Sequence, residues 1–124
     1  MSLPTSDEIR RVVGELLQGT PQPAKTAVLR LVQVLTRIHL VQWGLEDRCR
    51  DRALPDGERV EIKEEIDRSN LDRWRVVEAM DETLSRLLPR PHEDAIPHTE
   101  TPGSVIDRLI IMLIKARKWA EGGR

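Results

Sequence analysis

Apolar residues recur every three or four positions in four stretches of the chain, and no stretch shows the strict alternation of a β-strand. The first helix opens at Thr5, whose spacing to Glu8 is that of a capping box, and it ends before Gly19. Its apolar face comprises Ile9, Val12, Val13, Leu16 and Leu17. A short proline-rich loop then leads to the second stretch.

Two long helices are predicted next, over residues 24–53 and 58–88. Each would span ~45 Å at the standard rise per residue. The segment between them reads Leu-Pro-Asp-Gly, which favours a tight turn. Because so short a connection leaves no room for a crossover, the two helices are expected to form an antiparallel hairpin.

The fourth helix follows a polar loop, and Thr101 is its predicted N-cap, with Pro102 in the first helical position. Ser104 and Asp107 offer an alternative cap one turn later. Residues 105–119 are apolar nearly all round, which predicts a central helix or one at a subunit interface. The expected fold is therefore all-α, a single domain over residues 1–124 built as a bundle of about four helices with a long hairpin.

The composition excludes several classes of protein. With 20 Lys and Arg residues against 21 Asp and Glu, the net charge is -1, so no basic field would attract nucleic acid or an anionic membrane. Aromatic residues make up 2%, too few for a face that stacks single-stranded bases. No apolar run is long enough to cross a bilayer. A lone cysteine, Cys49, and no signal-peptide segment are typical of a cytoplasmic protein.

Polar residues interrupt the apolar face of both long helices. Asn70 and Arg73 lie between apolar neighbours on the third helix, where an unpaired polar group would cost ~1–3 kcal/mol. When the hairpin is folded about its turn, Arg73 lies level with His39 and Asn70 lies level with Gln42. The predicted polar cluster, buried or lining a cleft, places His39, Gln42, Glu46, Asp47 and Arg50 opposite Asp67, Asn70 and Arg73.

Two interpretations of this cluster remain open. It is either a ligand site or a network of ion pairs that fixes the register of the helices, and some of its members could simply face water. In the second case His39 is expected to pair with Glu46 or Arg73 rather than bind a metal. Trp43 and Trp74 are expected to fill gaps between helices, or to form the wall of a ligand site.

The segment Glu-Thr-Pro-Gly-Ser-Val-Ile-Asp-Arg-Leu at positions 100–109, together with Trp-x-x-Glu-Asp at 43–47 and Ile-Asp-x-x-Asn-x-x-Arg at 66–73, is distinctive. Over residues 35–119 the chain resembles the bacterial family called domain of unknown function 4254. The resemblance implies an all-helical cytoplasmic protein and no established reaction. The polar residues that match the family, and are therefore the candidate ligand-binding residues, are Glu46, Asp47, Arg50, Asp67, Asn70, Arg73, Glu100, Asp107 and Arg108.

The chain also departs from the family pattern. His39 stands where the family usually has Asn, and Gly44 where it usually has His. Leu71, Trp74 and Ile110 likewise replace polar residues. If the family site is catalytic, these departures imply that this member has lost or retuned the activity.

Three hypotheses about function follow. In the first, a small anionic ligand of a biosynthetic pathway, such as a phosphate or a sugar nucleotide, binds Arg50, Arg73 and Arg108. The free N–H groups at the start of the fourth helix would contribute, and acidic residues would orient the arginines or hold Mg²⁺. In another hypothesis, the protein is a homodimeric scaffold that associates through the apolar fourth helix.

The remaining hypothesis is that the protein is a metal-dependent phosphohydrolase. The third helix carries the acidic pairs Glu61–Glu64 and Glu78–Asp81, but a continuous helix would hold them ~25 Å apart. A metal site made of Glu46, Asp47 and Asp67 across the hairpin is geometrically better, because hard cations require clustered oxygen ligands. The sequence does not decide whether the protein is an enzyme.

Overall fold

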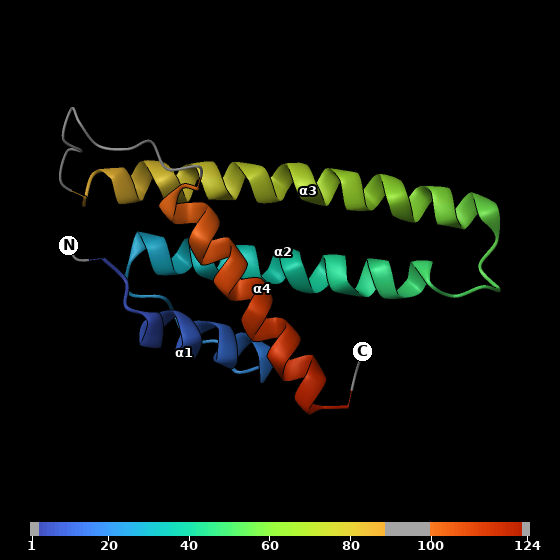
Figure 1. Ribbon diagram of the computed structural model, residues 1–124, viewed down its shortest axis with the longest axis horizontal. Coiled ribbons are helices and arrows are strands. Elements are labelled where there is room, and N and C mark those ends of the chain that lie inside the picture. Colours follow the sequence, from blue (N-terminus) through green and yellow to red (C-terminus); the bar gives the residue numbers. More distant parts are fainter. Residues whose placement is uncertain (1–2, 89–99, 123–124) are drawn as a thin grey trace.

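The computed structural model describes residues 3–88 and 100–122, and within them the chain forms four helices and no strand. The helices are α1 (Ser6–Leu17), α2 (Ala27–Cys49), α3 (Asp56–Ser85) and α4 (Pro102–Ala120). The all-α prediction of a helical bundle with a long antiparallel hairpin is therefore confirmed (Figure 1). The polar loop predicted before the fourth helix lies largely outside the described residues.

Local signals set the ends of the helices. The capping box predicted at Thr5 and Glu8 is present, and Gly19 follows α1 with a positive φ of 77°. Helix α2 begins three residues later than predicted because the Thr26 side chain accepts a hydrogen bond from the backbone N–H of Leu29. It ends at Cys49 rather than residue 53, and α3 begins at Asp56 and ends at Ser85 rather than spanning residues 58–88.

Helices α2 and α3 lie side by side along their length, and the tip of this hairpin extends beyond the other two helices (Figure 1). At the tip the guanidinium of Arg59 donates hydrogen bonds to the carbonyls of Cys49 and Asp51, the latter at 2.8 Å. This contact ties the start of α3 to the end of α2. It satisfies carbonyl groups that the end of a helix would otherwise leave unpaired.

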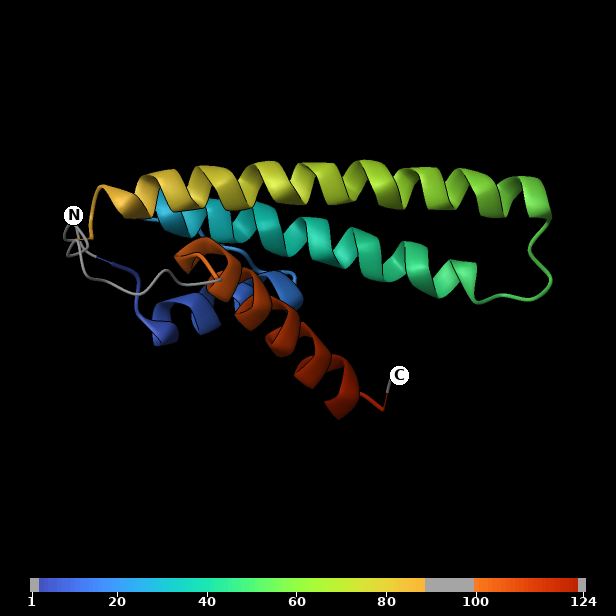
Figure 2. The same cartoon turned by 45° about the horizontal axis from the view of Figure 1, so that its top comes forward.

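Helices α1 and α4 pack together on one side of the hairpin (Figure 2). The core forms where they meet the half of the hairpin away from its tip, and each of the four helices contributes fully buried side chains. Val13 of α1, Leu35 of α2, Met80 of α3 and Ile110 of α4 are at most 1% exposed. Because neither α1 nor α4 lies beside the tip, its polar residues are largely exposed among the described residues.

Helix α4 crosses the hairpin on the outside of the bundle, so the prediction that it is central is wrong (Figure 1). Its inward stripe is Gly103, Asp107, Ile110 and Ile114. On its outward face Val105, Met112 and Trp119 are 45%, 61% and 78% exposed. A location at a subunit interface is untested and remains a prediction. No helix among the described residues is both long and apolar enough to cross a membrane.

Candidate functional site

Asp107 is the point at which α4 is joined to both helices of the hairpin. It is 7% exposed and lies among the apolar residues of the inward stripe of α4. Its Oδ1 lies 2.6 Å from Nε2 of His39 on α2. On its other side, Arg73 of α3 donates from Nε at 3.1 Å and from a terminal nitrogen at 2.6 Å to Oδ2. The carboxylate therefore bridges two helices that approach it from opposite sides.

The ionisation of Asp107 follows from these contacts. Burial alone would raise the pKa of this carboxyl group, but the hydrogen bonds and charges of His39 and Arg73 outweigh burial and hold the pKa below its ordinary value. The carboxylate is thus ionised at neutral pH. Because an ionised carboxylate only accepts hydrogen bonds, Nε2 of His39 carries the proton, and Nδ1 is left as the second functional nitrogen of the ring.

A second polar contact lies on the hairpin itself. The side-chain amide of Gln42 donates to Oδ1 of Asn70 at 2.7 Å. The predicted register, which set Gln42 level with Asn70 and His39 level with Arg73, is therefore confirmed, because His39 and Arg73 meet the same carboxylate. The prediction that His39 pairs with Glu46 or Arg73 is wrong, since its hydrogen-bond partner is Asp107.

The N–H groups at the start of α4 are already occupied. Thr101 and Ser104 form a capping box, which confirms Thr101 as the N-cap and rules out the alternative cap one turn later. The N–H of Gly103 donates to Oδ1 of Asp81 on α3 at 2.6 Å. Pro102 has no N–H to offer. The first turn therefore has no free donor for an anion, contrary to the first hypothesis.

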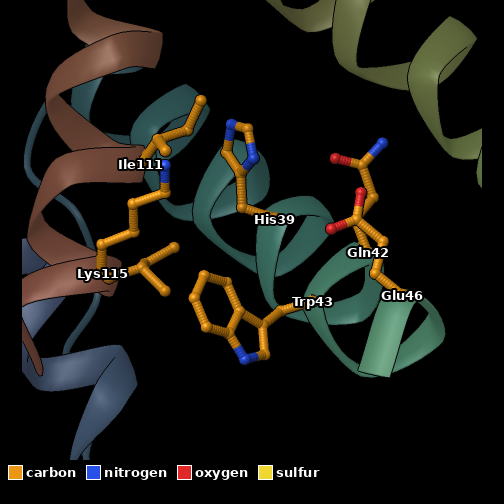
Figure 3. Close-up of a pocket in the computed structure, with 7 residues that line it drawn as sticks. His39, Gln42, Trp43, Glu46, Ile111 and Lys115 are labelled. Atoms are coloured by element: carbon orange, nitrogen blue, oxygen red, sulfur yellow. The ribbon is translucent and has the colours of Figure 1, made fainter. Parts of the chain in front are cut away.

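A pocket of about 210 Å³ opens between α2 and α4 beside His39. We call it the α2–α4 pocket; its lining residues are His39, Gln42, Trp43, Glu46, Ile111, Ile114 and Lys115. Figure 3 shows Lys115 and Ile111 entering from α4, facing His39 and Trp43 of α2. The pocket thus combines an ammonium group, a carboxylate and an imidazole with an indole and two isoleucine side chains.

A smaller pocket of about 190 Å³ lies on the other side of Asp107, against α3. It is lined by Arg73, Trp74, Val77, Ser104 and Asp107. Its polar groups are largely engaged: Arg73 with Asp107, and the Ser104 hydroxyl with the backbone of Thr101. Trp74 is 67% exposed, so it does not fill a gap between helices.

The structure brings together only part of the candidate set. Asp107 and the half-buried residues Arg73 and Asn70 take part in the contacts described above, and Glu46 lines the α2–α4 pocket while remaining exposed. The exposed residues Asp47 and Arg50 form a local ion pair of 3.7 Å beyond the crossing of α4, and Asp67 is also exposed. The buried cluster is therefore smaller than predicted, because neither α1 nor α4 covers the hairpin there.

The remaining candidates are Glu100 and Arg108, which pair with each other on the surface at the start of α4. Arg108 directly follows Asp107 on the helix and so points about 100° away from it. Arg50, Arg73 and Arg108 consequently do not converge on one ligand.

The acidic pairs of the hydrolase hypothesis lie on one uninterrupted helix, α3, and therefore stay apart. Over the described ranges, no group of three or more His, Cys, Asp or Glu side chains is arranged to hold a metal ion. Glu46, Asp47 and Asp67 do not form such a group.

Sequence reasoning missed two contributions to the site. Lys115 lines the α2–α4 pocket, and Asp81 accepts the Gly103 N–H. Asp107 was among the candidates, but its pairing with His39 and Arg73 was not predicted, although it shares the spacing of Gly103, Ile110 and Ile114 along the fourth helix. A carboxylate on a stripe otherwise made of small and apolar residues needs buried partners.

The fold and this site define a small helical bundle in which a buried carboxylate lies next to a pocket. Comparison with known families matches residues 29–123 to the family described as Protein of unknown function (DUF4254). The chain belongs to this family. No curated protein and no solved structure matches it.

Proposed function

We propose that the protein binds a small anionic ligand, of the size of a single sugar phosphate, in the α2–α4 pocket. The observation that supports this most is the composition of the pocket wall, in which Lys115 of α4 faces His39 and the indole of Trp43 on α2 (Figure 3). Ligand sites typically combine an apolar wall with a few convergent polar groups.

Each wall of the pocket suits a different part of such a ligand. The ammonium group of Lys115 takes part in no ion pair within the described residues, so it is available to a phosphate or carboxylate. The carboxylate of Glu46 suits sugar hydroxyls, as does the carbonyl oxygen of Gln42, whose amide nitrogen already donates to Asn70. The indole of Trp43 gives the apolar face of a ring a flat surface on which to pack.

Asp107 and Arg73 would act by positioning. Asp107 holds the His39 ring by Nε2, so the orientation of the imidazole in the pocket is fixed. Arg73 keeps Asp107 ionised and in place from the α3 side. In this proposal the two residues affect binding through His39 and do not touch the ligand.

The volume of the pocket limits the ligand. At about 210 Å³ it falls below the ~300–1,000 Å³ of pockets that enclose drug-sized molecules. A single sugar ring with a phosphate suits this space, whereas a sugar nucleotide would extend into solvent. We therefore favour the smaller ligand.

Isothermal titration calorimetry with a panel of hexose phosphates, the corresponding free hexoses and inorganic phosphate tests the proposal. A hexose phosphate should bind, and the free hexose and inorganic phosphate should bind at least tenfold more weakly. Lys115→Met should weaken the binding about tenfold or more, since a hydrogen bond to a charged group contributes ~1.5–3 kcal/mol. Trp43→Leu should weaken it as well.

Lys63→Met, at an exposed position of α3 away from the pocket, is the matched control and should bind like the wild type. If no probe on the panel binds, or if Lys115→Met and Lys63→Met bind equally well, the proposal is wrong. If inorganic phosphate binds as tightly as the hexose phosphates, the sugar part of the proposal fails.

A further inference from the structure

A pocket of about 220 Å³ opens between α1, the loop over residues 22–25 and the start of α2. We call it the α1–α2 pocket. Helix α1 packs against this part of α2 (Figure 1). Leu29, which lines the α1–α2 pocket, lies ten residues before His39 of the α2–α4 pocket, about 15 Å along the helix. The two pockets share no lining residue and lie apart.

The floor of the α1–α2 pocket is apolar. Val12 of α1 and Leu29 of α2 are 3% and 1% exposed and belong to the hydrophobic core. Pro23 and Ala24 of the loop extend this apolar surface toward the opening. A ligand with an aliphatic group would gain free energy by covering the floor, because apolar surface would be removed from water on both sides.

Three charged side chains surround this floor. Arg11 and Glu15 lie one turn apart on the same face of α1, and Lys25 comes from the loop. Within the described residues, none of the three takes part in an ion pair. An arginine that precedes a glutamate by four residues is the less favourable order for pairing along a helix. All three charges are therefore available to a ligand.

The charges are separated along the pocket. The pKa of Glu8 lies below its ordinary value, first because its carboxylate accepts the backbone N–H of Thr5, and further through the charges of Arg11 and Lys25. Both cations are thus near the Glu8 side of the pocket, whereas Glu15 lies one turn beyond Arg11 in the other direction. Glu8 itself is engaged in its capping box and does not line the pocket.

The wall formed by the loop is held in place from both sides. The side-chain amide of Gln33 donates to the carbonyl of Gln22 at 2.7 Å, which ties the loop to α2. The N–H of Thr20 donates to the carbonyl of Glu15 at 2.9 Å, which ties it to α1. Pro23 has a fixed φ angle. The pocket is therefore formed in advance, and a ligand would not have to order the loop.

We propose that the α1–α2 pocket binds a free amino acid with an aliphatic side chain, such as leucine. Its α-carboxylate would contact the guanidinium of Arg11 and the ammonium of Lys25, and its α-ammonium group would face Glu15. Its side chain would cover the apolar floor.

The charges of the pocket select a dipolar ligand over a simple ion. A plain carboxylate would leave Glu15 without a partner, and a plain amine would be repelled by Arg11 and Lys25. The volume of about 220 Å³ is smaller than the ~300–1,000 Å³ of pockets that enclose drug-sized molecules. It suits one amino acid, whereas a peptide would extend into solvent.

Titration of the labelled protein with leucine, followed by two-dimensional amide NMR spectroscopy, tests the proposal. Leucine should shift the resonances of residues that line the α1–α2 pocket, such as Glu15, Lys25 and Leu29. Three analogues each remove one part of the ligand: isocaproate lacks the ammonium group, isopentylamine lacks the carboxylate, and glycine lacks the side chain. Each analogue should bind about tenfold more weakly than leucine or worse.

Arg11→Met and Glu15→Gln should each weaken leucine binding about tenfold, because each removes a charged partner of the ligand. Arg10→Met is the matched control, since Arg10 is exposed on α1 outside the pocket, and it should bind like the wild type. Lys115→Met, which alters the α2–α4 pocket, should also bind leucine normally, so this test is independent of the function proposed for that pocket.

Circular dichroism should report unchanged helix content for all four variants. The proposal is overturned if leucine shifts no resonance up to its solubility limit, or if the shifts lie outside the α1–α2 pocket. It is also overturned if isocaproate, isopentylamine or glycine binds as tightly as leucine, or if Arg11→Met binds leucine as tightly as Arg10→Met.

Discussion

At Gly103 the backbone of α4 approaches α3 closely, and replacing this glycine with alanine tests the docking of α4. A Cβ atom at this position would lie 2.6 Å from Oδ1 of Asp81 and 2.9 Å from the backbone carbonyl oxygen of Val77. Both distances are shorter than any normal contact of a Cβ atom. The Asp81 side chain could rotate away, but the carbonyl of Val77 belongs to the middle of α3 and cannot.

The cost of Gly103→Ala can be estimated from these contacts. Inserting a methyl group into a packed contact costs ~1–3 kcal/mol. If Asp81 moves away, the N–H of Gly103 also loses its hydrogen bond to a charged acceptor, worth ~1.5–3 kcal/mol. Alanine regains at most ~1 kcal/mol of helix propensity. With Asp81 displaced, these contributions give an expected loss in the free energy of unfolding of about 1.5–6 kcal/mol, a large part of the ~5–15 kcal/mol typical of a domain.

Urea denaturation followed by circular dichroism measures this loss directly. Gly14→Ala is the matched control, because a Cβ atom there would meet nothing within 4 Å. In the middle of α1, that change should raise stability by ~0.5–1 kcal/mol. The two Gly→Ala substitutions should thus have opposite signs. A Gly103→Ala variant as stable as the wild type would refute this close approach of α4 to α3.

Two further predictions concern the buried polar contacts. The pKa of Asp107 is lower in the folded state than in the unfolded state. At a pH above the unfolded-state pKa, the ionised carboxylate therefore stabilises the fold fully, and this contribution is lost as the pH falls through the folded-state pKa. The difference in stability between the wild type and Asp107→Asn should therefore shrink below about pH 4, and a difference unchanged in acid would contradict this. Gln42→Leu should cost ~1–3 kcal/mol because it leaves Asn70 half-buried without its partner, whereas Gln42→Leu/Asn70→Leu should recover part of that loss in the same denaturation assay.

The features that sequence reasoning predicted correctly are set by neighbouring residues. Thr5 with Glu8 and Thr101 with Pro102 mark the starts of α1 and α4, and caps involve residues within one turn of each other. The level position of Gln42 and Asn70 follows from the short turn between two helices of regular rise. These features depend on spacing along the chain and not on how the helices cross.

The role of Asp107 depends on the crossing of α4, which no local pattern specifies. Its partners Arg73 and His39 are 34 and 68 residues away in the sequence. Which side of α4 faces the hairpin, and at what height, follows from packing of the whole core. The same crossing decides that Asp47 and Asp67 are exposed, since α4 does not reach the tip of the hairpin.

The central claim is that Asp107 holds α4 to the hairpin through buried contacts with its two partners. A double-mutant cycle with Arg73→Ala, Asp107→Ala and the double variant, measured by urea denaturation, tests it most directly. Asp107 has a side chain only 9% exposed and Arg73 one 32% exposed, so their interaction is weakly screened by solvent. We predict a favourable coupling energy of about 2 kcal/mol. A coupling energy indistinguishable from zero would contradict the account.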